Sequence, residues 1–184
     1  MTGLGRVAAL ALAGASLMGC AGAHEAGAPQ SGGRYMAGHF RAEAVLHTAD
    51  GAEAGRAVAQ EKDGALLVTV EVKGLPAGVH GVHIHTTGKC EAPGFTTAGG
   101  HWNPGAKQHG MDNPMGMHAG DLPNLTVKAD GTGKLSFTVH GGSYEQLLDE
   151  DGAAFVVHGG PDDLKSDPAG NSGPRIACGV FGAV

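Results

Sequence analysis

The sequence predicts an all-β domain of about eight short antiparallel strands, arranged as a sandwich or barrel with two long functional loops. Apolar residues recur at every second position in several short runs, which is the period of a strand with one buried face. Glycine-containing turn signals separate these runs, and 34 of the 184 residues are glycine, far above the usual ~7%. No stretch has a convincing helical period, although residues 143–151 could form one or two helical turns.

The first element, residues 1–20, is typical of an export signal and is excluded from the fold. Arg6 precedes a mainly apolar stretch of twelve residues, Val7 to Met18, which is too short to span a bilayer. The segment ends in Leu-Met-Gly-Cys, which resembles a bacterial lipobox in which Cys20 is lipidated after cleavage. Because Met18 is less usual at its position, plain cleavage nearby is the alternative. Either way we expect export to the periplasm or cell envelope, with this lipid as the only link to a membrane.

Residues 21–38 are small and polar without a period, and they predict a flexible tether before a domain at residues 39–184. His24, Met36 and His39 could bind copper, but scattered exposed side chains are the interpretation we favour for them.

The predicted strands follow in order along this domain. In residues 66–73, Leu66, Val68, Val70 and Val72 share one face. Asp-Gly pairs at positions 50–51, 63–64 and 130–131 supply turn signals between strands. The full set of predicted strands covers residues 41–47, 55–61, 66–73, 81–85, 125–128, 134–139, 153–158 and 174–181.

Two long segments, residues 86–120 and 159–173, do not fit the strand pattern. Loops of this length in a compact domain are usually functional, and both hold residues with metal-ligand chemistry. His83 and His85 precede the first loop and His158 precedes the second. Because residues i and i+2 of a strand share a face, His83 and His85 form one wall of imidazoles on the outside of the barrel.

The histidines form two candidate ligand sets. Within the first loop, three imidazoles and one carboxylate at spacings of eight, nine and three residues make a closed four-coordinate set that suits zinc: His101, His109, His118 and Asp121. An all-imidazole set suits copper and comprises His83, His85, His158 and one histidine shared with the first set.

Three cysteines are present. If Cys20 carries lipid, Cys90 and Cys178 remain, either joined in a disulfide or as two buried free thiols. Export favours the disulfide, which would close a loop of about 88 residues.

The net charge of −6, without a basic stripe, argues against nucleic acid as a partner.

The chain resembles the copper/zinc superoxide dismutases over about residues 40–184. The resemblance rests on several motifs in one order: GVHIHTTGKC, GGHWNP, HAGDLPN, VVHGGPDD and GNSGPRIACGV. It implies an eight-stranded Greek-key barrel, copper and zinc as cofactors, and superoxide as the substrate. The short span between His85 and Cys90 is similar to that of bacterial members.

The resemblance also implies a role for each site residue. His83, His85, His101 and His158 correspond to copper ligands, and His101, which bridges the metals, joins His109, His118 and Asp121 in the zinc set. Arg175 corresponds to the active-site arginine and Asp162 to a carboxylate that hydrogen-bonds ligands of both metals, although Asp162 could instead simply cap its loop. Cys90 and Cys178 correspond to a disulfide.

The implied reaction converts superoxide to oxygen and hydrogen peroxide as copper alternates between Cu(II) and Cu(I). The alternative is an exported copper/zinc-binding or copper-delivery module on the same scaffold, and a copper-only variant is disfavoured by the complete zinc set. A homodimer is one assembly that the resemblance allows. Met111, Met115 and Met117 in the first loop could help load copper, but exposed or gap-filling methionines are the interpretation we favour.

Overall fold

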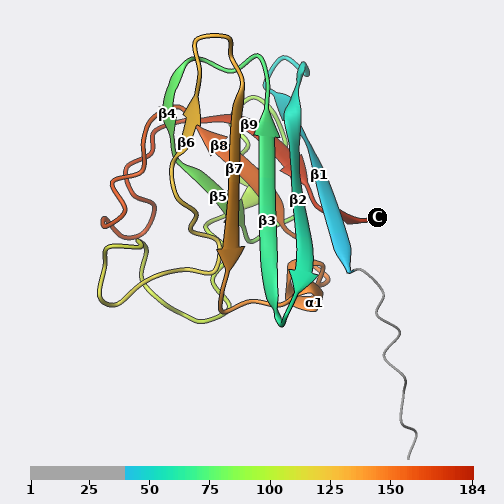
Figure 1. Ribbon diagram of the computed structural model, residues 1–184, viewed down its shortest axis with the longest axis vertical. Helices are drawn as coiled ribbons and strands as arrows, with labels where there is room; N and C mark the ends of the chain where they lie inside the picture. The colour runs from blue at the N-terminus through green and yellow to red at the C-terminus, as the bar shows by residue number, and fades with distance from the viewer. Residues whose placement is uncertain (1–39) are drawn as a thin grey trace, which may run out of the picture. The chain divides into compact units, whose positions relative to one another are not determined.

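The computed structural model describes residues 40–184 (Figure 1). The predictions for the export signal at 1–20, the tether at 21–38, Cys20, His24, Met36 and His39 lie outside the described residues.

Within the described residues the chain forms ten strands, one short helix and one 3₁₀ turn. The strands are β1 (Arg41–Thr48), β2 (Glu53–Lys62), β3 (Ala65–Val72), β4 (Gly78–His80), β5 (Val82–His85), β6 (Leu125–Val127), β7 (Gly133–Val139), β8 (Ala154–His158), β9 (Arg175–Val180) and β10 (Gly182–Ala183). The 3₁₀ turn η1 spans Thr96–Ala98, and helix α1 spans Tyr144–Leu147.

The strands form a nearly closed antiparallel barrel. Their order is β4-β6-β7-β3-β2-β1-β9-β8-β5, with β10 paired to β1. The two ends of this path, β4 and β5, are consecutive in the chain and separated by Gly81 alone. The backbone therefore runs directly from one edge strand of the sheet to the other. Gly81 also donates its N–H to the Gly160 carbonyl and accepts the His158 N–H, which holds this junction beside the end of β8. The all-β prediction is confirmed, and the barrel form is the one adopted.

The core lies inside the barrel and follows the predicted alternation. Leu66, Val68, Val70 and Val72 of β3 are buried, whereas the residues between them are half-buried. On β8, Phe155 and Val157 join the barrel core, while Ala154 and Val156 belong to a second cluster outside it, with Phe95 and Ala98. Strand β8 is therefore covered on both faces, which explains its continuous apolar sequence.

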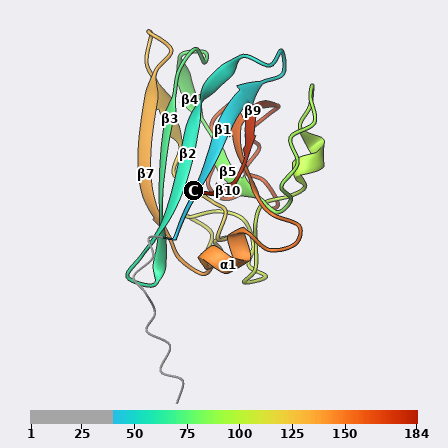
Figure 2. The ribbon, with the colours of Figure 1, turned by 90° about the vertical axis from the view of Figure 1, so that its right-hand side faces the viewer.

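The segment that covers the outer face of β8 is residues 86–100. Figure 2 shows η1 standing outside the barrel near β9. A disulfide between Cys90 and Cys178 ties this segment to β9, which confirms the predicted pairing. The cover therefore has both an apolar contact and a covalent link to the sheet.

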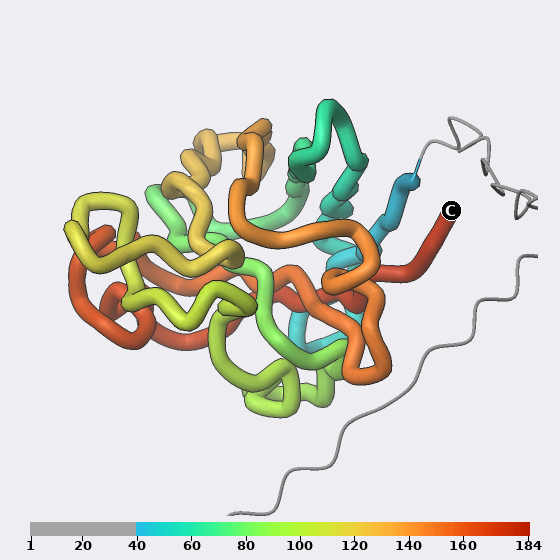
Figure 3. Tube along the Cα trace, turned by 90° about the horizontal axis from the view of Figure 1, so that it is seen from below, coloured from blue at the N-terminus to red at the C-terminus, as the bar shows by residue number. Residues whose placement is uncertain are grey.

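The other two long loop segments lie against each other on one side of the barrel, at the left of Figures 1 and 3. Asp112 donates its N–H to Leu164, and the His109 N–H donates to the Asp167 carboxylate. These bonds join residues 101–120 to residues 159–173.

Two short strands, β4 and β10, are not among those that the sequence predicts. β4 has three residues and β10 has two, too few for an alternation to be visible. The helical turn expected within 143–151 is present as α1, and Ser143 and Gln146 cap its N-terminus reciprocally. Within residues 40–184, no helix is long and apolar enough to cross a membrane.

The disulfide should contribute strongly to stability, because Cys90 and Cys178 are 88 residues apart. We expect the full chain carrying Cys90→Ser and Cys178→Ser to lose up to about 4–5 kcal/mol of unfolding free energy relative to the oxidised protein. Urea unfolding followed by tryptophan fluorescence measures this, with Cys20→Ser as the control for removal of a cysteine. An unchanged unfolding midpoint in the double variant would contradict the expectation.

Candidate metal centre

The metal centre is built on the edge of β5. One edge of this strand pairs with β8, and the other is taken by the first long loop. His85 bridges to His101 and His83 bridges to Asp121 in antiparallel fashion. Trp102, which is buried in the barrel core, anchors the chain next to His101. Backbone pairing therefore brings residues of the loop beside the two strand histidines.

Four histidine rings converge at this edge, and each has one buried nitrogen without a hydrogen-bond partner. The atoms are His83 Nδ1, His85 Nε2, His101 Nε2 and His158 Nε2. One ligand atom from each of these residues lies within 4.8 Å of those of the other three. Buried polar atoms are normally satisfied, so four such nitrogens at one point indicate a binding site.

The remaining nitrogen of each ring is held by the protein, which fixes its orientation. The Nδ1 of His85 lies 2.9 Å from the Gly99 carbonyl oxygen, and the Nδ1 of His158 lies 3.2 Å from that of Gly173. A carbonyl only accepts, so in both rings Nδ1 carries the proton and Nε2 keeps its lone pair free. The Nε2 of His83 lies 2.5 Å from Asp162 Oδ2, which leaves Nδ1 as its free atom.

A second set lies next to the first and shares His101. The Nδ1 of His101 lies 2.8 Å from Asp121 Oδ1. The Nδ1 atoms of His109 and His118 lie 3.0 and 3.2 Å from the same oxygen. The other oxygen of Asp121 accepts the N–H groups of Gly110 and His118. A tetrahedron with zinc–nitrogen bonds of 2.0–2.1 Å separates its ligand atoms by roughly 3.3 Å, so this set has the spacing of a zinc shell.

The carboxylate of Asp162 contacts one histidine of each set. Its Oδ2 faces His83 and its Oδ1 lies 3.0 Å from His109 Nε2. Oδ1 also accepts the Leu164 N–H, so the carboxylate both bridges the two sets and caps its own loop. Asn124 holds the Asp162 backbone at both its N–H and its carbonyl. A Cβ at Gly170 would clash with this carboxylate and with His109 Nε2, so the close packing requires glycine.

Burial keeps the converging rings in the neutral form. It lowers the pKa of His83 to about 3, that of His85 to about 2 and that of His158 to about 4. The pKa of His101 is lowered as well, again mainly by burial. A neutral imidazole offers a lone pair to a metal, whereas a protonated one does not, so these rings are ready to act as ligands near neutral pH.

His109 and the two carboxylates behave differently. Burial opposes the charged form of each group, but mutual hydrogen bonds outweigh it. The bonds to Asp121 and Asp162 raise the pKa of His109 to about 9. The pKa values of Asp121 and Asp162 are held below their usual range. Both acids are therefore anionic near neutral pH, as ligands or partners of a cationic centre require.

Arg175 lies at the start of β9, beside the four-histidine set. Its guanidinium donates to the carbonyls of Phe95 and Gly99 at 2.6 Å each. After burial, its positive charge is among the causes that lower the pKa values of His85 and His158. A guanidinium has five N–H groups, so donors remain for a small anion.

Several residues that hold this centre were missed by the sequence reading. The carbonyls of Gly99 and Gly173 fix two rings, and a backbone carbonyl leaves no sequence signal. His80 is buried with its ring between the carbonyls of His158 and Pro76, at 2.7 and 2.9 Å, so it ties the His158 backbone to the connection between β3 and β4. Asp167 accepts the His109 N–H at 2.6 Å. Only the polar character of His80 and Asp167 could have drawn attention to them.

The structure brings together every predicted site residue within residues 40–184. The members of each four-residue set come together, Asp162 contacts His83, Arg175 donates to Phe95, and Cys90 is joined to Cys178. The donor chemistry fits the cofactors expected of it: four neutral imidazole nitrogens suit copper, and three imidazoles with one carboxylate suit zinc.

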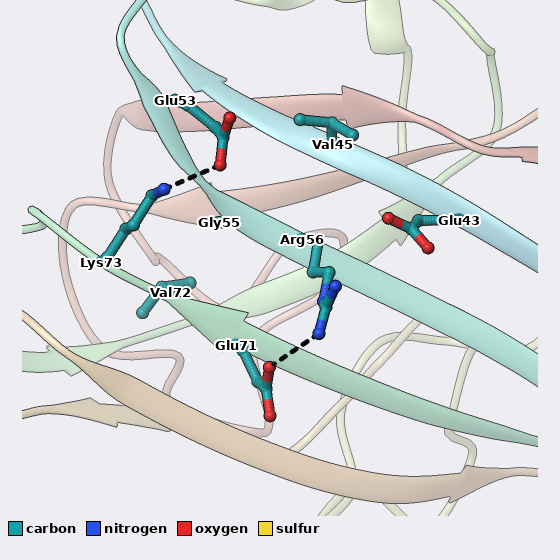
Figure 4. Close-up of a pocket in the computed structure, with 8 residues that line it drawn as sticks. All are labelled: Glu43, Val45, Glu53, Gly55, Arg56, Glu71, Val72 and Lys73. Carbon is teal, nitrogen blue, oxygen red and sulfur yellow. Dashed lines mark hydrogen bonds and ion pairs between the residues drawn. The ribbon is translucent and has the colours of Figure 1, made fainter.

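A cleft of about 490 Å³ lies elsewhere, on the outer face of β1, β2 and β3 (Figure 4). Four of its charged side chains are paired with one another, Lys73 with Glu53 at 2.8 Å and Arg56 with Glu71 at 3.4 Å. The fifth, Glu43, lies 3.3 Å from Arg41 outside the lining. Gly55 in this cleft allows β2 to approach the β3 backbone closely. The buried side-chain atoms without a partner among the described residues lie in the four-histidine set and not in this cleft.

Comparison with known proteins agrees with this geometry. A family model described as copper/zinc superoxide dismutase (SODC) matches residues 53–181. A superoxide dismutase [Cu-Zn] from Aquifex aeolicus is 43% identical over 148 residues, which cover 77% of this chain and 86% of the relative. One from Caulobacter vibrioides is 40% identical over 147 residues, 76% of this chain and 84% of the relative.

Among solved structures, a double mutant of a superoxide dismutase-like protein from Bacillus subtilis matches with a TM-score of 0.70 and 43% identity, covering 75% of this chain and 95% of that chain. The Cu/Zn superoxide dismutase from Brucella abortus matches with a TM-score of 0.63 and 32% identity, covering 76% and 98%. The chain thus belongs to the copper/zinc superoxide dismutase family.

Proposed function

We propose that this protein is an active superoxide dismutase that converts superoxide to oxygen and hydrogen peroxide. The observation that carries the proposal is the set of four buried ring nitrogens without partners, gathered within 4.8 Å. In this proposal the copper ligands are His83, His85, His101 and His158. The zinc ligands are His101, His109, His118 and Asp121.

Copper, when bound, supplies one-electron chemistry by alternating between Cu(II) and Cu(I), and zinc supplies a fixed positive charge without redox activity. The protein's part is to hold the rings rigidly. Each ring of the copper set is fixed by a bond at its other nitrogen, from Gly99, Gly173, Asp121 or Asp162. Such second contacts orient ligands and set their basicity.

His101 is the residue suited to move a proton, because reduction of superoxide to peroxide consumes protons. Its Nδ1 belongs to the zinc set, while its Nε2 is buried without a partner and faces the copper set. A proton can therefore be held at Nε2 without breaking the contact at Nδ1. The side chain of His101 is only 2% exposed, and His101 lines a cleft of about 260 Å³ that Trp102 also lines.

Arg175 is suited to capture the substrate. The whole chain carries a charge of −6, which repels an anion, so a local positive charge beside the rings must counteract it. The guanidinium is held by two carbonyls, which spares it most of the cost of becoming ordered when the substrate binds.

The alternative is a copper- and zinc-binding module without catalysis. A module that only stores metal has no need of a fixed arginine beside the rings, and Arg175 is present and oriented. Superoxide consumption by the protein loaded with both metals separates the two functions, since a storage module would bind both ions and leave superoxide unchanged.

We expect the two ligand sets to be separable by mutation. His158→Ala removes one of the four unpartnered nitrogens and should abolish bound copper and activity while leaving zinc content largely intact. His118→Ala should instead lower zinc content. Metal analysis of the purified variants together with superoxide consumption tests this. Activity in His158→Ala would show that the copper assignment is wrong.

Changing Arg175 should mainly affect substrate capture. We expect Arg175→Glu to lower kcat/KM for superoxide by about tenfold or more, because the local positive charge becomes negative. Arg175→Lys keeps the charge, so it should lose less. Lys128→Glu makes the same change in net charge at the turn between β6 and β7 and should have little effect. Equal rates for Arg175→Glu and the unmodified protein would remove Arg175 from the mechanism.

We propose further that the protein is exported and held at a membrane by lipid on Cys20. The sequence of residues 1–20 and the Cys90–Cys178 disulfide support this, since disulfides persist in oxidising compartments. Assembly as a homodimer remains a prediction.

We expect Cys20→Ser to move the protein from the membrane fraction to the soluble fraction of expressing bacteria, with unchanged specific activity. Mass spectrometry of the mature N-terminus provides the direct measurement. A mature wild-type chain that lacks lipid would contradict the anchor and support plain cleavage.

A further inference from the structure

We propose that Met111, Met115 and Met117 form a second, surface-exposed copper site that binds one cuprous ion through three thioether sulfurs. The proposal concerns a ligand set that contains no histidine and does not depend on superoxide chemistry.

The first observation is where the methionines lie. The chain has six, and the only three within residues 40–184 occur in one seven-residue segment, Met111 to Met117. Methionine usually fills gaps in a core, but none of these three belongs to either apolar cluster or packs against one. Met115 is 63% exposed and the other two are half-buried. Of the favoured interpretation, exposed or gap-filling methionines, exposure describes Met115, and none of the three fills a gap in either cluster.

The second observation is that the backbone brings the three residues together. A Cβ on Gly116 would overlap the Gly110 carbonyl oxygen, so the chain crosses itself closely at these two glycines. Met111 follows Gly110, and Met115 and Met117 flank Gly116. The Met115 carbonyl accepts the Gln108 N–H at 3.1 Å, and the Met115 N–H donates to Asn113 Oδ1 at 2.9 Å. The three methionines therefore belong to the two stretches of backbone that meet at this crossing.

The third observation is that hydrogen bonds to residues of the zinc set fix the backbone of this crossing. Asp121 Oδ2 accepts the N–H groups of Gly110 and His118, which stand at the two ends of the methionine segment. Asn113 Nδ2 donates to the His109 carbonyl at 2.9 Å. The closed shape of the segment is therefore set by contacts outside the methionines, which lowers the ordering cost of a ligand that they bind.

The chemistry of three thioethers selects one kind of ion. Neutral, polarizable sulfur ligands favour soft Cu(I) over hard or borderline ions such as Mg²⁺ and Zn²⁺. Asp112, which is exposed between Met111 and Asn113, adds a negative charge beside the cation. The site would hold copper in the reduced state at the surface, a few residues from His118.

The test uses the full chain loaded with copper and zinc, so that the histidine sets are filled. The protein is titrated anaerobically with Cu(I) in the presence of ascorbate and a competing cuprous chelator, and X-ray absorption reports the ligands of the added ion. We expect one additional Cu(I) per chain with sulfur neighbours. The Met111→Leu, Met115→Leu, Met117→Leu triple variant should bind it at least about a hundredfold more weakly, since all its ligands are lost.

Leucine conserves the volume of methionine, so the triple variant should keep its zinc content and unfolding midpoint. Met36→Leu is the matched control and should bind Cu(I) as the unmodified chain does. Three outcomes would overturn the proposal: no additional Cu(I), equal binding by the triple variant, or an added ion with only nitrogen and oxygen neighbours. Zinc titrated in the same way should not compete, and displacement of Cu(I) by equimolar Zn²⁺ would also contradict a thioether site.

Discussion

The centre depends on one backbone interaction, the pairing of the first long loop with the free edge of β5. Ile84 accepts the Trp102 N–H and donates its own N–H to Gly120, and Gly120 donates to Trp102. A Cβ on Gly120 would overlap the Ile84 carbonyl, so only glycine permits this approach. Without these bonds His101 and Asp121 would not lie beside His83 and His85. Each of the two ligand sets would then lose members.

The burial of four histidine nitrogens without hydrogen-bond partners lowers the stability of the folded chain. Each buried ring nitrogen without a partner costs about 1–3 kcal/mol relative to its hydrated state. Four of them lie in one cluster, so their burial lowers the free energy of unfolding unless another group binds them. An ion that binds only the folded state removes this cost, and metal binding and stability are therefore coupled. The disulfide and the barrel core contribute stability that offsets the cost of these buried nitrogens.

Much of this could be predicted from the sequence. The alternation of apolar residues in β3 and β7, together with the glycine-containing turns, was enough to predict an all-β fold. The His-x-His pair predicted that His83 and His85 share one face of a strand. The two ligand sets followed from motif spacing and family resemblance, and the structure gathers those residues at one site. The groups that orient the ligand rings could not be predicted. Two of them are the backbone carbonyls of Gly99 and Gly173, and because every residue has a carbonyl, the sequence does not mark these two. The short strands β4 and β10 escaped because their pairing depends on distant neighbours, not on local pattern. Whether the methionines fill gaps in a core could not be predicted, because that depends on the burial of each side chain in the folded chain.

Asp162 touches one histidine of each ligand set, and His101 belongs to both. Occupation of either set must then alter the orientation and basicity of groups that serve the other. Thermodynamic linkage makes such an effect reciprocal: whatever factor one ion contributes to the affinity of its neighbour, the neighbour returns. The pair of sets is therefore a single heterotropic unit, in which the order of filling can change rates but cannot change the final free energy.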